Sequence, residues 1–262
     1  MEIKHSVQIV TGSATGIGAA CAIELARRGA RVVVNYSRSE TEARQTVREC
    51  EALGADVLLV KADVSHDADC QRLAHATLAK WGRIDGLINN AGATKFAPNH
   101  RDLTALSAED FQSIYAVNVI GAFQMIRACA PAMQKQGRGG VVNISSIAGV
   151  AGNGSSVAYA ASKGALNTMT LSLARALGPE IRVNAVCPGF VETRWLQQGL
   201  GAETYAQVKT NYEATTPLKS TIAPQDVANA AIWLLEGADK VTGEFIIVDS
   251  GAHLGMTPLK AR

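Results

Sequence analysis

A tyrosine and a lysine stand four residues apart in the segment 145–167, SSIAGVAGNGSSVAYAASKGALN. The segment predicts a helix on which Tyr159 and Lys163 share one face. An unperturbed phenol has a pKa near 10, so its use as a base at neutral pH costs about 4 kcal/mol. A lysine charge about 5 Å away, at an effective dielectric constant near 20, offsets roughly 3 kcal/mol of that cost. The spacing fits proton transfer by Tyr159, and taken alone it also fits an ordinary surface contact.

A glycine-rich segment near the N-terminus, TGSATGIGAA (11–20), follows an apolar run and opens a helical pattern. Glycines let the backbone turn tightly and approach a pyrophosphate, whose charge is stabilised by the free N–H groups of the helix start. The spacing is GxxxGxG in place of the usual GxGxxG, and glycines that only pack a helix against a strand produce similar patterns. The segment predicts a dinucleotide site.

The second apolar run ends in polar residues, RVVVNYSRSE (31–40), without a carboxylate before Glu40. In dinucleotide folds an acidic residue about 20 positions after the glycines binds the ribose 2′-hydroxyl, whereas a nearby arginine accommodates a 2′-phosphate. Here the acidic position holds Tyr36, followed by Ser37 and Arg38. This favours NADP(H), with Arg38 as the charge partner. NAD(H) stays open, because Thr15 in the glycine turn supplies no second positive charge.

The elements that must position these residues alternate along the chain as short β-branched runs and amphipathic helical segments. The runs are apolar throughout, which is typical of strands buried on both faces of a parallel sheet. Helical segments at 17–28, 40–53 and 67–81 each end before a glycine, where a C-terminal cap is expected. The pattern predicts α/β architecture, a doubly wound Rossmann-type parallel sheet of about seven strands, at 7–12, 31–36, 56–63, 86–92, 140–145, 181–189 and 244–251.

We expect one domain over 1–262, with a substrate loop at about 190–216 and a short C-terminal tail at 252–262. The formal net charge of +2 gives no electrostatic reason to expect nucleic acid or an anionic membrane as a partner. The five scattered cysteines form no CxxC pair, and no uncharged apolar run reaches about 18 residues. These features predict a cytoplasmic protein that acts on a small molecule.

Several motifs together resemble the classical short-chain dehydrogenases/reductases. They are TGxxxGIG at 11–18, NNAG at 89–92, Asn118, a serine thirteen residues before Tyr159, YxxxK at 159–163 and PGxVxT at 188–193. The resemblance runs over essentially the whole chain. It implies hydride transfer between NAD(P)(H) and a small-molecule carbonyl or secondary alcohol, without a metal.

The resemblance also implies roles for individual residues. Tyr159 would be the acid/base, Lys163 would lower its pKa and bind the nicotinamide ribose, Ser146 would fix the substrate oxygen, and Asn118 would kink its helix and hold a water. Substrate contacts are expected from Ser146, Asn153, Tyr159 and Trp195. Cofactor contacts are expected from Gly12, Ser13, Thr15, Gly16, Ile17, Gly18, Tyr36, Ser37, Arg38, Asp63, Val64, Asn90, Ala91, Gly92, Tyr159, Lys163, Pro188, Gly189, Val191 and Thr193.

Two alternatives stand beside a free small-molecule substrate. Reduction of β-ketoacyl groups on acyl carrier protein calls for a basic patch at the site entrance, for which the sequence offers Lys135 and Arg138 next to Glu180. A non-catalytic scaffold that senses the cofactor is the other, and such a scaffold has no need of an acid/base tyrosine. The resemblance further implies a homotetramer, or a homodimer, joined through the helices at 104–136 and 158–178 and the C-terminal strand region.

Overall fold

The computed structural model describes residues 1–255, which form one seven-stranded parallel sheet in the order β3-β2-β1-β4-β5-β6-β7. The predicted α/β fold and its seven strands are confirmed. Most strands end a few residues earlier than predicted, because the residues that follow them turn into loops around a cavity. The strands are β1 (Val7–Val10), β2 (Arg31–Tyr36), β3 (Val57–Lys61), β4 (Gly86–Asn89), β5 (Gly139–Ile144), β6 (Ile181–Pro188) and β7 (Phe245–Val248).

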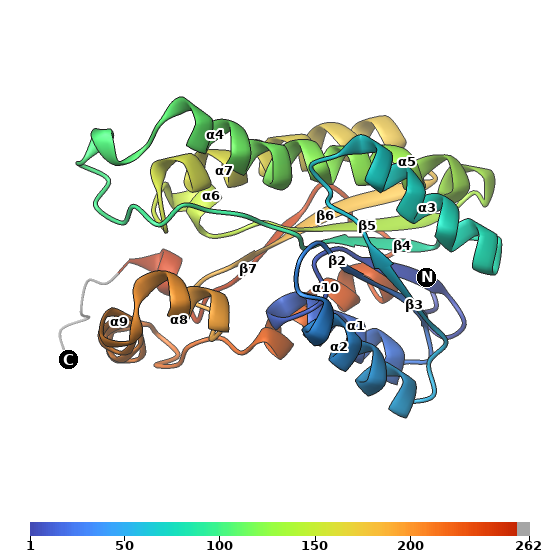
Figure 1. Ribbon diagram of the computed structural model, residues 1–262, viewed down its shortest axis with the longest axis horizontal. Coiled ribbons are helices and arrows are strands. Elements are labelled where there is room, and N and C mark those ends of the chain that lie inside the picture. The colour runs from blue at the N-terminus through green and yellow to red at the C-terminus, as the bar shows by residue number, and fades with distance from the viewer. Residues whose placement is uncertain (256–262) are drawn as a thin grey trace.

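Helices cover both faces of the sheet (Figure 1). One face carries α1 (Gly16–Arg27), α2 (Glu40–Ala52) and α10 (Pro224–Glu236). The other carries α3 (Asp67–Trp81), α4 (Ala108–Tyr115), α5 (Ala122–Lys135), α6 (Ala148–Ala151) and α7 (Val157–Leu177). Each face has its own buried apolar cluster: Val32 and Val34 belong to one and Val33 to the other. Since successive strand residues point to opposite faces, a run of three valines serves both clusters.

Glycines end the first three helices as predicted. Gly29, Gly54 and Gly82 follow α1, α2 and α3 with φ of 81°, 85° and 71°. These left-handed conformations close the last helical turn and cost glycine little, because it has no Cβ atom. Each helix therefore ends at its glycine, and the chain then returns to the sheet.

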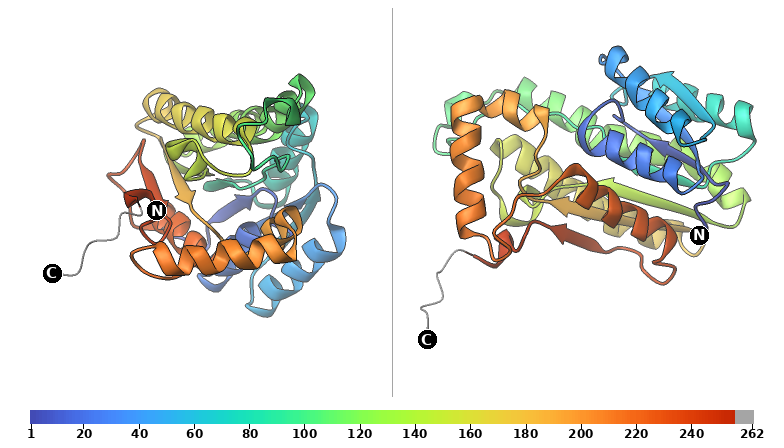
Figure 2. Two further views of the ribbon diagram at one scale, coloured as in Figure 1. Left: turned by 90° about the vertical axis from the view of Figure 1, so that its left-hand side faces the viewer. Right: turned by 90° about the horizontal axis from the view of Figure 1, so that it is seen from below.

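The strand order reverses between β1 and β4, so the loops that leave their carboxyl ends diverge and open a crevice. Two further helices, α8 (Arg194–Leu200) and α9 (Ala202–Thr215), lie at the end of the molecule opposite the N-terminus (Figure 2). Neither of them buries a residue fully. The chain then crosses to α10 and β7, and η3 (Ala252–Leu254) is the last described element. Residues 256–262 of the predicted tail lie outside the described part of the chain.

A continuous helical stretch, Ala108–Lys135, joins α4 and α5 through the π-helical segment η2 (Ala116–Gly121). Among residues 1–255 it is the one stretch long and apolar enough to cross a membrane by length and composition. Half of its most apolar window is buried inside the fold, where α5 packs on the sheet next to α3.

Candidate active site

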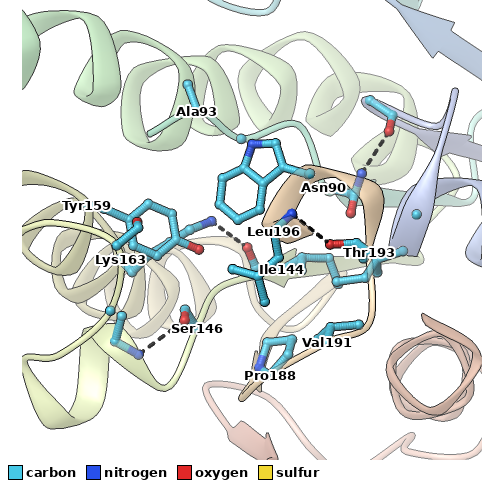
Figure 3. A pocket seen from close by; sticks show the side chains of 18 of the residues that line it. Asn90, Ala93, Ile144, Ser146, Tyr159, Lys163, Pro188, Val191, Thr193 and Leu196 are labelled. Carbon is cyan, nitrogen blue, oxygen red and sulfur yellow. Dashed lines mark hydrogen bonds between the residues drawn. The ribbon is translucent and has the colours of Figure 1, made fainter. Parts of the chain in front are cut away.

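A cavity of about 810 Å³ runs along the carboxyl ends of the strands, from β3 to β6. Figure 3 shows side chains that line it. Most of the predicted site residues line it, although they come from widely separated segments. The predicted residues found in its wall are Gly12, Thr15, Gly16, Ile17, Ser37, Arg38, Asp63, Val64, Asn90, Ala91, Gly92, Ser146, Asn153, Tyr159, Lys163, Pro188, Gly189, Val191, Thr193 and Trp195. Ser13, Gly18, Tyr36 and Asn118 do not line it.

The glycine turn between β1 and α1 leaves open backbone at one end of the cavity. Gly12 and Gly16 have φ of 60° and 58°, and a Cβ atom on Gly12 would come within 2.9 Å of the Ala91 Cα. The residue before α1, Thr15, is extended and its side chain does not cap the helix. The first N–H groups of α1 therefore face the cavity without a side-chain acceptor, which is the arrangement that binds a phosphate.

Asn35, which the sequence did not single out, holds this turn in place. Its Oδ1 accepts a hydrogen bond from the Gly12 N–H at 3.0 Å, and its Nδ2 donates to the Ala62 carbonyl oxygen at 3.0 Å. Its backbone N–H donates to the Ser13 hydroxyl oxygen at 2.9 Å, so that hydroxyl is buried against the strands. An amide inside an otherwise apolar strand was the available signal, because buried amides need partners.

The end of β2 separates its polar residues into two environments. Tyr36 is buried in the core on the α1 side, and burial and the nearby Glu40 carboxylate raise the pKa of its phenol. The Glu40 carboxylate accepts hydrogen bonds from Arg44, at 2.9 Å and 2.6 Å. Ser37 and Arg38 are exposed and line the cavity. The residue in the acidic position thus points into the core, and the next two side chains border the site.

The segments after β3 and β4 complete this half of the cavity. Asp63 accepts hydrogen bonds from the Ser65 N–H and hydroxyl at 3.0 Å and 2.7 Å. Burial raises the pKa of Asp63, but these hydrogen bonds and nearby cations outweigh it and leave the pKa below its usual value. The Asn90 Nδ2 donates to the carbonyl oxygens of Thr11 and Gly12 at 3.0 Å and 2.9 Å, which ties the loop after β4 to the glycine turn.

Helix α7 carries Tyr159 and Lys163 to the centre of the cavity (Figure 3). The helix begins after Ser156, whose hydroxyl accepts from the Tyr159 N–H at 3.2 Å. Ser146, in the loop after β5, lines the same cavity, and its hydroxyl accepts from the Ala148 N–H at 3.1 Å. The Lys163 ammonium is buried and donates to the Ile144 carbonyl oxygen at 2.8 Å. A phenol with a hydroxyl donor and an ammonium group beside it can exchange a proton with a bound oxygen.

Burial dominates the pKa values of the pair. It raises the pKa of Tyr159 to about 12, although the neighbouring Ser146 hydroxyl lowers it in part. Burial also lowers the pKa of Lys163 to about 8. Both ionised forms are therefore costly in the buried site. The lowering of the tyrosine pKa by Lys163 stays a prediction.

Asn118 lies in the π-helical segment η2, where the helix carries a local bulge. Its Oδ1 accepts from the Ala93 N–H at 2.7 Å, and its Nδ2 donates to the Ala93 carbonyl oxygen at 3.0 Å and to the Ser162 hydroxyl at 2.9 Å. Ser162 in turn donates to the Tyr159 carbonyl oxygen at 2.7 Å. Asn118 thus connects the loop after β4 with the helix that carries the tyrosine.

The opposite wall begins after β6. Val191 forms an isolated bridge with Ile222, and the Thr193 hydroxyl accepts from the Leu196 N–H at 3.3 Å at the start of α8. A Cβ atom on Gly16 would lie 3.4 Å from the Thr193 Cγ2, so this wall reaches the glycine turn. The segment after β6 therefore spans the cavity from the phosphate end to the tyrosine.

The family model described as enoyl-(acyl carrier protein) reductase matches residues 12–253. A protein from Streptomyces violaceoruber, named as a ketoacyl reductase of the granaticin polyketide synthase, is 44% identical over 248 residues, which is 95% of this chain and 96% of that protein. The chain belongs to the short-chain dehydrogenase/reductase family.

Other short-chain dehydrogenases/reductases are similar over nearly their full length. A 3-oxoacyl-[acyl-carrier-protein] reductase from Synechocystis is 36% identical over 252 residues, or 95% of this chain and 97% of that protein. A 7α-hydroxysteroid dehydrogenase solved with NADH and 7-oxo glycochenodeoxycholic acid is 32% identical, with a TM-score of 0.87 and 95% of each chain covered. As a member of this family the chain is an oxidoreductase that uses a nicotinamide cofactor.

Lys135 and Arg138 lie far from the active site of this short-chain dehydrogenase/reductase, which corrects their suggested place near its entrance. They stand at the end of α5 and just before β5, at the amino edge of the sheet. The cavity follows the carboxyl end of the same strand, roughly 17 Å away at the rise of an extended strand. Their position before a strand was a signal in the sequence that they could not reach the site.

Proposed function

We propose that the chain transfers a hydride between NADP(H) and a small-molecule carbonyl compound or secondary alcohol, with Tyr159 as the acid/base. The observation that carries the proposal is that Ser146, Tyr159 and Lys163, which come from two separate segments, line the same cavity. In reduction Tyr159 gives its proton to the carbonyl oxygen and in oxidation it takes the alcohol proton, while Ser146 donates a hydrogen bond to the same oxygen. Lys163 stabilises the negative charge that develops on the phenol, and Asn118 positions the tyrosine helix and holds a water.

The cavity fits a dinucleotide on two observations. The glycine turn leaves room where a Cβ atom would collide, and the first turn of α1 contains no acidic side chain. Gly16 and Ile17 would hold the pyrophosphate, Asp63 and Val64 the adenine, and Asn90 and Lys163 the nicotinamide side. Ser13, Gly18 and Tyr36 do not line the cavity, so cofactor contacts from them are proposed only for their backbone atoms. When bound, the cofactor supplies or accepts the hydride.

We propose NADP(H) over NAD(H) because of the end of β2. Ser37 and Arg38 line the cavity there, and Arg38 forms no ion pair with a carboxylate among residues 1–255. The Glu40 carboxylate is neutralised by Arg44. A 2′-phosphate would thus meet a free guanidinium and no competing negative charge apart from Asp63, whereas a ribose 2′-hydroxyl would find no carboxylate at the strand end.

A second candidate is reduction of β-ketoacyl groups on acyl carrier protein, which the names of two relatives favour. The basic side chains around the cavity argue against it. Lys95, Arg194 and Lys209 are each paired with a carboxylate, at 2.7 Å, 2.9 Å and 2.7 Å. An acidic carrier would have to displace these pairs, so we rank a free small molecule first.

We also propose that residues 190–216 close over the bound substrate within a single domain, and that the protein is a cytoplasmic homotetramer or homodimer. Exposed apolar side chains on the helices named for the interface support the assembly, namely Ile120 and Phe123 near η2 and Leu171 on α7. Burying such side chains against a second copy would stabilise the pair.

A spectrophotometric screen tests the proposed function. Ketones, aldehydes, sugars and secondary alcohols are offered with NADPH and NADH in parallel, together with a β-ketoacyl thioester on acyl carrier protein. We expect turnover of a free carbonyl compound with NADPH. Turnover of the carrier-bound substrate alone would support the second candidate. Tight cofactor binding without any turnover would contradict both and favour a cofactor-sensing scaffold.

A further inference from the structure

The cavity wall beyond Tyr159 is made of aromatic rings that come from segments far apart in the chain. The ring centre of Trp195, on α8, lies 5.4 Å from that of Phe96 and 6.2 Å from that of Tyr159. Both distances are within the range of direct aromatic contact. The three rings, which we call the aromatic wall, therefore continue without a break from the proton-transferring hydroxyl to the outer part of the cavity.

A glycine on α8 leaves the space that the Phe96 ring occupies in this wall. Gly199 lies one helical turn after Trp195, and a Cβ atom built on it would collide with the Phe96 ring. A glycine inside a helix lowers the stability of that helix by roughly 1 kcal/mol relative to alanine. Helix α8 is therefore less stable than it would be with alanine at this position, where a methyl group would overlap the ring. Phe96 is thereby seated between Gly199 and Trp195 and has a defined position in the cavity.

Within residues 1–255, the same part of the cavity offers a negatively charged substrate no free cation. Arg194 is paired with Glu42 at 2.9 Å, and the Lys163 ammonium is buried and already donates to a backbone carbonyl oxygen. The other polar side chains lining this end, Asn153 and Ser155, are uncharged. A carboxylate or phosphate placed here would lose its hydration without gaining a charged partner.

We propose that the substrate is a neutral carbonyl compound, or the corresponding alcohol, whose flat aromatic ring lies against Trp195 with the oxygen directed to Tyr159. This inference rests on the proposed carbonyl chemistry and adds the substrate class. Trp195 is 44% exposed although it lines the cavity, so a large apolar surface remains for a ligand to cover. Ring-on-ring contact then favours an aryl over a saturated substituent by about two- to tenfold.

The test compares acetophenone with cyclohexyl methyl ketone, which have nearly the same size and differ in the flatness of the ring. The measured quantity is the ratio of their kcat/KM values with NADPH, in the wild-type chain and in variants. Comparing ratios between variants cancels the intrinsic difference in carbonyl reactivity. We expect Trp195→Leu to lower the ratio about two- to tenfold and Trp195→Phe to keep most of it. Trp233→Leu, which alters a similarly exposed tryptophan on α10, should leave it unchanged.

A second variant moves the Phe96 ring of the aromatic wall without removing any aromatic atom. Gly199→Ala forces the Phe96 ring out of its seat, so we expect the same direction of change as in Trp195→Leu, with unaltered cofactor affinity. An unchanged ratio in both variants would overturn the aromatic-ring proposal while leaving the carbonyl chemistry intact. If the wild-type chain reduced neither these ketones nor any other carbonyl compound, the proposed function itself would fail, and the substrate class with it.

Discussion

Lys163 holds its ammonium nitrogen 5.6 Å from the centre of the Tyr159 ring. The position of this ammonium does not depend on the phenol, because the nitrogen is fixed by the carbonyl oxygen at the end of β5. The two side chains therefore respond separately to mutation, although they serve one proton transfer.

Tyr159→Phe removes the hydroxyl and leaves Lys163 in place. We expect kcat to fall by about 10²–10⁴, the usual share of general acid–base catalysis, while the dissociation constant for NADPH changes less than about twofold. Steady-state kinetics and fluorescence titration with NADPH measure the two quantities. Tyr115→Phe on α4 is the matched control. Near-normal turnover in Tyr159→Phe would remove the tyrosine from the mechanism.

Lys163→Met tests the buried charge through the pH dependence of stability. The folded chain releases this proton near pH 8, whereas the unfolded chain keeps it up to about 10.5. The burial cost is therefore complete below pH 8 and disappears as the pH rises through this window, so this group makes the protein more stable at higher pH. We expect the wild-type free energy of unfolding to rise by about 3 kcal/mol relative to Lys163→Met between pH 8 and 10.5, in urea titrations. A constant difference would show that the lysine titrates normally.

Arg38→Ala tests the cofactor preference. Loss of a charged hydrogen bond of about 1.5–3 kcal/mol should lower the ratio of kcat/KM for NADPH to that for NADH by roughly ten- to hundredfold. Arg48→Ala should leave the ratio unchanged, because Arg48 is an exposed arginine on α2 whose side chain is hydrogen-bonded to Gln45. Equal ratios in the wild type and Arg38→Ala would place the selectivity elsewhere.

Limited trypsin digestion tests closure of residues 190–216. Arg194 and Lys209 are accessible, with 54% and 32% of their side chains exposed, and both lie in this segment. We expect cleavage after them to slow several-fold when NADPH and a substrate are present, because a segment held over ligands unfolds locally less often. Cleavage after Lys240, beyond α10, serves as the internal reference. An unaltered rate at all three sites would contradict closure.

Much of the fold follows from local signals. Runs of β-branched residues and glycines after helices predict the strands and three helix ends, because burial on both faces and left-handed caps impose those residue types. The placement of Tyr159 and Lys163 on one face likewise follows from their separation by about one helical turn. Ser146 is brought to the tyrosine by the return of the chain to the sheet, which the strand order provides.

Contacts between distant segments were not predictable in the same way. The amide of Asn35 reaches Gly12 from the neighbouring strand, and the amide of Asn118 reaches Ala93 from another segment of the chain. The pKa of Tyr159 depends on how completely the ring is shielded, a property of the packed site and not of residue spacing. The polar nature of these residues was visible, but their partners were not.

The seat that Gly199 provides for Phe96 has an evolutionary consequence. Since any side chain on Gly199 would enter the space of that ring, the two positions cannot vary independently. Relatives with alanine or a larger residue at the first position should carry a smaller residue at the second, and a loss at one should be followed by a compensating change at the other. Covariation between these two positions, which lie about a hundred residues apart in the sequence, would then show how the shape of the substrate pocket differs between lineages.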